Sequence, residues 1–161
     1  MKFKAMRLFL FTLILLIAGT AFASAKPIIK ADQTYFDVNT GLYVLNGNVT
    51  VIVGNRTITA GQAKVSIATL EVWGSGGITL TQDDIYFSGD SVYVYGAQKR
   101  AKIDGGVVFK RNGLAIEANN VSYSWDTKLA VFNGNVTVTQ DGTPPVTSDT
   151  VTYNVGTGAF Q

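Results

Sequence analysis

The sequence predicts an all-β chain, an elongated antiparallel β-jelly roll built from repeats of about 29 residues after an N-terminal signal helix. Three observations support this fold class. A glycine-centred triplet recurs at a fixed spacing, apolar and polar residues alternate with a period of two after each triplet, and turn sequences separate the apolar runs. The 17 glycines and the three prolines fit strands joined by tight turns.

Residues 1–25 have the layout of an export signal. A basic heptapeptide precedes an uncharged apolar run (residues 8–18), and two small-x-small sites come directly before Lys26. We expect cleavage after Ala25, which leaves residues 26–161 as one domain outside the cytoplasm. The alternative is an uncleaved anchor, because residues 8–25 carry no charge and nearly suffice to span a bilayer as a helix.

The composition excludes several kinds of chemistry. Three of the 13 Lys and Arg residues lie in the expected signal, so residues 26–161 carry a net charge of −1, which gives no reason to expect a nucleic-acid partner. The chain has no Cys and no His. Disulfides, Cys/His zinc sites and histidine-based catalysis are therefore excluded, and we expect no metal, no cofactor and no catalytic residue.

The strongest pattern is an internal repeat. The triplets recur at one constant interval and are Gly47-Asn48-Val49, Gly76-Gly77-Ile78, Gly105-Gly106-Val107 and Gly134-Asn135-Val136. A second marker precedes each triplet, again at a nearly constant distance, in the order Ala31-Asp32, Ala60-Gly61, Ser88-Gly89 and Ala118-Asn119. A fifth copy of this marker, Ser148-Asp149, opens a final unit. Such regular repetition indicates stacked supersecondary units, each containing two strands.

Within each unit, the side-chain period is that of a strand. Apolar residues follow each triplet glycine at the second and fourth positions, with mostly polar residues between them, which places one face in an apolar interior. Turns are predicted at Asn39-Thr40-Gly41, Gly54-Asn55, Asp83-Asp84, Asn112-Gly113, Asp126-Thr127-Lys128 and Asp141-Gly142, and a loop at Pro144-Pro145. A parallel β-helix is the alternative architecture, but the hairpin-type turns favour the jelly roll.

These markers resemble those of the OstA-like/LptA family, which carries lipopolysaccharide between the two membranes of Gram-negative bacteria. The best matches are Lys30-Ala31-Asp32-Gln33 through Asn46-Gly47-Asn48-Val49, and then Phe132-Asn133-Gly134-Asn135-Val136; the resemblance covers residues 28–161. It implies a periplasmic protein that supports outer-membrane assembly, with inner-membrane and outer-membrane jelly-roll partners and head-to-tail self-association. Whether the chain is the soluble bridge, a module anchored in the inner membrane or a shorter paralogue stays open, as do the exact lipid and the number of copies.

The inward-facing residues are the candidate lipid contacts. Exposing an acyl chain to water costs ~0.8 kcal/mol per CH₂ group, so a carrier must present a continuous apolar surface to the lipid A chains. The predicted set is Phe36, Leu45, Val49, Val51, Val72, Ile78, Leu80, Val107, Phe109, Val136 and Val138. The alternative is that these residues form only a packed core.

The two ends of the sheet are the candidate assembly edges. Residues 150–160 contain no charged side chain, and an uncharged terminal strand favours pairing with another chain. The predicted edge residues are Ile28, Ile29, Ala31, Thr34, Phe36, Val151, Tyr153 and Val155. A frayed terminus is the alternative.

Three functions compete for this sequence. The first is a lipid-carrying bridge module, which the export signal, the repeat and the resemblance favour. The second is a structural or adhesive β-repeat protein of the envelope without lipid cargo. The third is a polysaccharide-processing enzyme on a β-helix. The third requires convergent carboxylates, and Asp83-Asp84 is the only adjacent acidic pair. We therefore expect no enzymatic activity.

The basic clusters at residues 99–102 and 110–111 are interpreted as solvated hairpin ends, and Trp73 and Trp125 as packed side chains.

Overall fold

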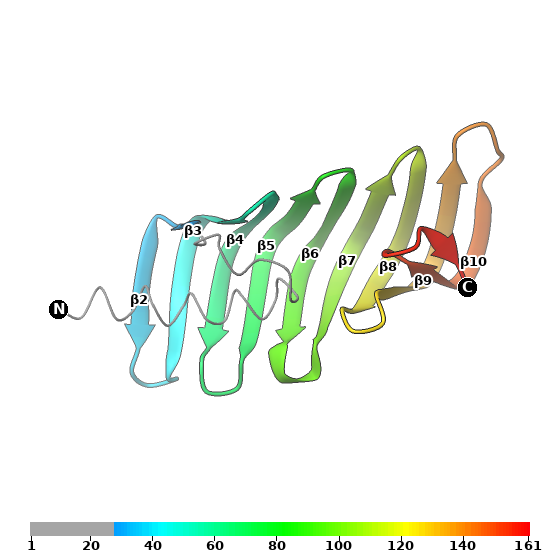
Figure 1. Cartoon of the computed structure of the whole chain (residues 1–161). Helices are drawn as coiled ribbons and strands as arrows, with labels where there is room; N and C mark the ends of the chain where they lie inside the picture. The colour runs from blue at the N-terminus through cyan, green and yellow to red at the C-terminus, as the bar shows by residue number, and fades with distance from the viewer. Residues whose placement is uncertain (1–27) are drawn as a thin grey trace.

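The computed structural model describes residues 28–161, which form one antiparallel sheet of eleven strands (Figure 1). The predicted export signal lies outside the described residues. The strands are β1 (Ile28–Lys30), β2 (Gln33–Asp37), β3 (Leu42–Val53), β4 (Arg56–Ser66), β5 (Glu71–Gln82), β6 (Ile85–Tyr95), β7 (Arg100–Arg111), β8 (Leu114–Ser124), β9 (Leu129–Gln140), β10 (Val146–Asn154) and β11 (Ala159–Phe160). A single 3-10 turn, η1 (Gly96–Gln98), connects β6 to β7 in this part of the chain.

Each strand from β3 to β10 pairs with the next strand in the sequence, so the sheet is a continuous meander that advances along one axis (Figure 1). The short strands β1 and β2 both pair with β3 and together act as one interrupted strand at the N-terminal edge. All pairings are antiparallel, which rules out the parallel β-helix. The predicted elongated antiparallel jelly roll is confirmed.

The repeated triplets mark a bulge in the middle of the long strands. The pairing register shifts at Gly47-Asn48 in β3, and both residues have positive φ angles, +74° and +48°. Glycine and asparagine tolerate this left-handed conformation better than other residues. Equivalent shifts occur at residues 76–77, 105–106 and 134–135. The strict repeat read from the sequence is therefore a row of bulges across the sheet.

The second marker lies opposite each bulge. A Cβ atom placed on Gly47 would overlap the carboxylate of Asp32, and one on Gly105 would overlap that of Asp90. The third copy of the marker is thus Gly89-Asp90, which keeps the same interval as the triplets, and the predicted copy Ser88-Gly89 is wrong by one position. The reason is that Ser88 is small, like the alanine or serine that opens each of the other copies, and mimics their pattern.

The row of bulges divides the sheet into two facing arms. The first arm consists of the strand halves that run to the two-residue turns at 54–55, 83–84 and 112–113 and to the turn at 141–142, and we call it the short-turn arm. The long-turn arm is formed by the halves that run to the longer turns at 38–41, 67–70, 96–99 and 125–128. All the predicted turns and the loop at Pro144-Pro145 are present. Inward side chains of the two arms enclose the interior of the jelly roll.

The C-terminal segment folds back on the sheet. Residues 159–160 form β11, which pairs with Tyr153 and Asn154 at the end of β10. The prediction that residues 150–160 form one terminal strand is therefore wrong: the strand ends at Asn154, and a turn reverses the chain. The reversal uses Gly158, which has a φ of +74°. The unpaired side of β10 is thereby limited to residues 146–151.

The C-terminal half of the interior is filled by a closed aromatic cluster, defined here as Phe87, Phe109, Phe132 and Tyr153 with the aliphatic side chains around them. Phe109 of the short-turn arm and Phe132 of the long-turn arm are fully buried, and their ring centroids lie 5.9 Å apart. Tyr153 packs 5.4 Å from Phe109. A separate apolar cluster around Leu45, Val49, Ala63 and Val65 lies near the N-terminal edge.

Candidate functional site

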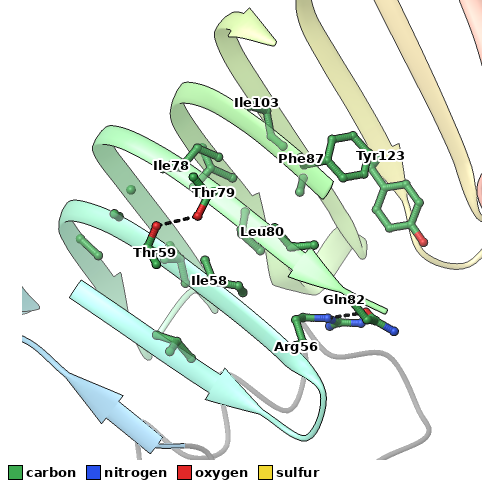
Figure 2. Close-up of a pocket in the computed structure, with 18 of the residues that line it drawn as sticks. Arg56, Ile58, Thr59, Ile78, Thr79, Leu80, Gln82, Phe87, Ile103 and Tyr123 are labelled. Carbon is green, nitrogen blue, oxygen red and sulfur yellow. Dashed lines mark hydrogen bonds between the residues drawn. The ribbon is translucent and has the colours of Figure 1, made fainter. Parts of the chain in front are cut away.

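An apolar cavity of about 240 Å³ occupies the interior between the N-terminal cluster and the closed aromatic cluster (Figure 2). Its lining runs from Ile29 and Leu45 at the N-terminal edge to Phe87 and Tyr123, and it also includes Val155 in the turn after β10. The site is therefore a hollow section of the jelly roll, bounded at its far end by the packed aromatic rings.

Aliphatic side chains from both arms form the walls of the cavity. Figure 2 shows Ile58 of β4, Ile78 and Leu80 of β5 and Ile103 of β7 among the lining residues. Ile58 and Leu80 are directly paired in the sheet and belong to the alternating apolar set of the short-turn arm. Six of the predicted inward residues line this cavity: Leu45, Val49, Val51, Val72, Ile78 and Leu80.

The remaining predicted residues lie elsewhere. Four belong to or pack against the closed aromatic cluster, and these are Val107, Phe109, Val136 and Val138. Phe36 lies on β2 at the N-terminal edge, where its ring is 46% exposed and packs against Tyr43 at a centroid distance of 4.9 Å. The alternation of the sequence identified the inner face correctly, but it did not distinguish the hollow section from the filled one.

A polar group lies at the rim of the cavity, and sequence reasoning missed it. Arg56 is the first residue of β4, and its Nε donates a hydrogen bond of 2.8 Å to Oε1 of Gln82, its partner across the sheet. Both side chains line the cavity. Burial among apolar groups lowers the pKa of the Arg56 guanidinium, and burial raises the pKa of the Tyr123 hydroxyl. The signal was available, since Arg56 lies two positions before Ile58 and shares its face.

The two tryptophans have different surroundings. Trp125 is 9% exposed and lines the cavity beside Tyr123. Trp73 faces the outside of the long-turn arm, where it stacks on Tyr93 at a centroid distance of 5.1 Å. The Tyr93 hydroxyl donates a 2.8 Å hydrogen bond to Glu71, which raises the pKa of Tyr93. The pKa of the Glu71 carboxyl is lowered mainly by a hydrogen bond from the Thr69 hydroxyl and then by the one from Tyr93. Both tryptophans are packed, as the sequence predicted.

The basic cluster at residues 99–102 is engaged in exposed ion pairs, whereas Arg111 of the cluster at 110–111 is partly buried and pairs with Asp84, so the interpretation as a solvated hairpin end is wrong for Arg111. Lys99 lies 3.2 Å from Asp126, and Lys102 lies 2.9 Å from Asp104. The hydrogen bond to Asp104 raises the pKa of Lys102. Pairs of this kind contribute little to stability because water screens them.

The two edges of the sheet differ in how much of their backbone is free to pair with another strand. Within residues 28–161, β1 and β2 pair only with β3, so their other side faces outward. At the other end, Val151 is paired to β9 alone, whereas Tyr153 is paired to β9 on one side and β11 on the other. Tyr153 is also 4% exposed, so it does not belong to a free edge, contrary to the prediction.

Residues 28–161 contain no group of three or more acidic side chains arranged to hold a metal ion. Nor does any helix in the same range have the length and apolar character needed to cross a bilayer. The residues that line the cavity offer apolar contact along most of its walls, the hydroxyls of Thr59 and Thr79, which are hydrogen-bonded to each other, and cationic hydrogen-bond donors at its rim.

The fold and cavity define a class, the open β-jelly rolls with an apolar interior. No protein-family model and no curated protein matches the sequence. Among solved structures, the chain is similar to LptH, the LptA-homologous periplasmic component of the lipopolysaccharide transport device of Pseudomonas aeruginosa. The TM-score is 0.53 at 18% identity, over 61% of this chain and 75% of LptH. At this identity the similarity establishes an LptA-like fold and nothing beyond it.

Proposed function

We propose that this protein is a lipid-binding module of the periplasm, which shields lipopolysaccharide acyl chains during transport from the inner to the outer membrane. The observation that carries the proposal is the apolar cavity of about 240 Å³ inside an LptA-like jelly roll. The similar structure, LptH, is itself a periplasmic component of a lipopolysaccharide transport device. Export by residues 1–25 is part of the same proposal.

The size of the cavity suits part of one hydrocarbon chain. A cavity of about 150 Å³ with aliphatic and aromatic walls is large enough to take up benzene, whereas sites for drug-sized ligands have about 300–1,000 Å³. Each CH₂ group transferred from water into such walls gains ~0.8 kcal/mol. We therefore propose that acyl contacts are made mainly by the hollow section, with Ile58 and Leu80 at its centre, and that the four predicted residues in the closed aromatic cluster support the fold.

The competing function is a structural or adhesive β-repeat module. The closed aromatic cluster favours it for the C-terminal half, because Phe109 and Phe132 leave no space between the arms there. A hollow apolar section lowers the stability of the fold, because the side chains that line it lack packing partners. A purely structural module gains nothing from such a section. The cavity thus favours the lipid-binding proposal.

Photo-crosslinking from adjacent positions tests the proposal. A photoreactive amino acid at Leu80 faces the cavity, whereas at the next residue, Thr81, it faces solvent. With purified lipopolysaccharide we expect labelling from Leu80 and at most background from Thr81. Equal labelling from both positions, or labelling from neither, supports the structural function instead. The transport role is tested in cells, where depletion of the protein should cause lipopolysaccharide to accumulate at the inner membrane.

Transport over a distance requires contact with similar modules. We propose that the outward edge of β2, at Thr34, pairs with the outward edge of β10, at Val151, of a second copy or of a partner jelly roll. The chain contains no cysteine, so introduced cysteines are its only thiols. A mixture of the Thr34→Cys and Val151→Cys proteins should form an oxidised dimer, and neither variant alone should do so. A dimer formed equally well by one variant alone contradicts head-to-tail pairing.

A further inference from the structure

Each marker of the repeat contacts the first glycine of the triplet that follows it. A Cβ atom added to that glycine would come too close to the marker on the neighbouring strand. The four contacts, marker first, are Asp32 with Gly47, Gly61 with Gly76, Asp90 with Gly105 and Asn119 with Gly134. The strand order always places the triplet strand after its marker strand. Marker and triplet are therefore complementary parts of two adjacent strands.

The fifth marker, Ser148-Asp149, has no such triplet beside it in residues 28–161. It lies on β10, the last long strand of the sheet (Figure 1). The register of β10 against β9 shifts at Asp149, as it does at the other markers, and Asp149 is exposed. The side of residues 146–151 that faces away from β9 pairs with no strand of the described chain. This edge therefore presents one half of a marker contact.

The same half of β10 also lacks apolar cover. Val146 is 64% exposed, although it pairs with Val138, which packs against the closed aromatic cluster. The equivalent residue of β8 is Ile116, which pairs with Val138 on one side and with Phe109 on the other and is fully buried. A strand added beside β10 would cover Val146 in the same way, and burial of apolar surface would favour its binding.

The end of the chain determines how much of β10 an added strand can reach. β11 and the amide of Gln161 occupy the last three residues of β10, 152–154. An added strand therefore reaches only residues 146–151, which is long enough for one triplet and the residues on either side of it. In the register that β9 has on β8, the first glycine of that triplet lies beside Asp149.

We infer that the free edge of β10 binds a partner strand that carries a Gly-Asn-Val triplet, and that Asp149 selects for glycine at the bulge. An asparagine is favoured next, because the amide of Asn48 donates a 2.9 Å hydrogen bond to the marker Asp32. The inference rests on the proposed edge pairing and deepens it, since it names the strand that β10 takes. Both edges of the described sheet, β1–β2 and β10, carry markers, so a partner jelly roll is favoured over a second copy.

A labelled peptide with the sequence of residues 132–140 supplies such a strand. Fluorescence anisotropy follows its binding to the protein, up to millimolar peptide. We expect saturable binding, and binding at least about tenfold weaker for the Gly134→Ala peptide, because the added Cβ combines left-handed strain with overlap of Asp149.

Two protein variants isolate the part played by Asp149. Asp149→Gly removes the overlap, so the loss caused by Gly134→Ala in the peptide should become about fivefold smaller or less. Asp149→Asn is the matched control and should keep the full loss, because Asn119 contacts Gly134 in the same way. Circular dichroism verifies that both variants are folded.

An extended chain provides a second measurement that does not depend on the affinity of a free peptide. Residues 132–140 appended after Gln161 continue β11 directly into the expected register, so the strand is supplied within one molecule. We expect the midpoint of urea unfolding to rise, and the Gly134→Ala version of the appended strand to lose most of this rise.

A peptide with the sequence of residues 28–37, from the β1–β2 edge, separates the inference from pairing between copies. Binding of this peptide without binding of the triplet peptide contradicts the inference and leaves the proposed pairing of copies standing. Equal binding of the glycine and alanine peptides, or a loss that survives Asp149→Gly, also contradicts it. If neither peptide binds and the appended strand adds no stability, the inference and the edge pairing both fail. Lipid binding by the cavity is tested independently by the photo-crosslinking.

Discussion

Arg111, at the end of β7, donates a 2.6 Å hydrogen bond from Nη1 to the carbonyl oxygen of Val155, which is distant in the sequence. Arg111 ends its strand on the short-turn arm, and Val155 follows β10 on the long-turn arm, so the bond joins the rims of the two arms. The same guanidinium lies 2.9 Å from Asp84 through Nε. This contact closes the filled half of the jelly roll, whereas the half that contains the cavity has Arg56 at the corresponding rim.

Replacing Arg111 with methionine should open this closure. The variant loses the bond to Val155 and the ion pair to Asp84, and the exposed Asp84 carboxylate is left without its cationic partner. We expect the free energy of unfolding to fall by about 1.5 kcal/mol, the lower end of the range for hydrogen bonds to charged groups, because the ion pair is partly exposed. Urea unfolding measures the change. Lys110→Met is the control, because its exposed side chain is next to Arg111, and its effect should stay within about 0.5 kcal/mol. Equal effects of the two substitutions would show that the contact between the arms does not stabilise the fold.

The same contact should make stability depend on pH. The hydrogen bond from Arg111 is the main cause that lowers the pKa of the Asp84 carboxyl below its ordinary value, and Asn112 contributes a further 2.6 Å hydrogen bond. A carboxyl with a lower pKa in the folded state stabilises the protein above its unfolded pKa, and this contribution is lost as the pH falls. We therefore expect stability to decrease below about pH 5.

Asp84→Asn isolates this contribution from that of other carboxyls, such as Asp37, whose pKa is also lowered. The difference in stability between the native protein and this variant should shrink as the pH is lowered from neutral into the acidic range. In the Arg111→Met background, Asp84→Asn should have little effect at any pH. A difference that is constant with pH would mean that Asp84 does not titrate differently in the folded and unfolded states.

Two adjacent glycines distinguish backbone strain from close packing at the bulges. Gly105 and Gly106 both have positive φ, at +82° and +52°, but only at Gly105 would a Cβ overlap Asp90; at Gly106 it would meet no atom within 4 Å. Gly106→Ala should therefore show only the strain of the left-handed conformation, about 1 kcal/mol, and Gly105→Ala a clearly larger loss. Thermal unfolding measures both.

Asp90→Gly should recover the excess loss in the Gly105→Ala protein, since it recreates the pairing seen at Gly61 and Gly76, where no side chain intervenes. If the two alanine variants are equally stable, the contact between marker and bulge does not explain the regular spacing of the triplets within this chain.

The sequence was sufficient to predict the strands, turns and inner face, because these depend on local periodicity and on glycine at fixed positions. It was insufficient to predict which half is hollow. Phe109 and Phe132 lie in different repeats, and their contact depends on how strongly the sheet curls, which no local pattern encodes. Arg56 was missed for a related reason: a cation at the start of a strand is typical of solvent-exposed turns, and only the arrangement of both arms places it at a cavity rim.

Two alanines on the inner face of the long-turn arm test the contrast between the hollow and the filled half. Ala63 lines the cavity, and Ala130 is fully buried in the closed aromatic cluster. Ala63→Leu should extend into empty space, so we expect the free energy of unfolding to change by less than about 1 kcal/mol, whereas Ala130→Leu should lose about 1–3 kcal/mol through overpacking. Because the added leucine occupies the proposed acyl site, Ala63→Leu should also weaken binding of tetradecanoate and of tetradecanol alike, measured by Trp125 fluorescence. A large loss of stability in Ala63→Leu would indicate that the arms close over this section in solution, and unchanged binding would place the acyl chain elsewhere.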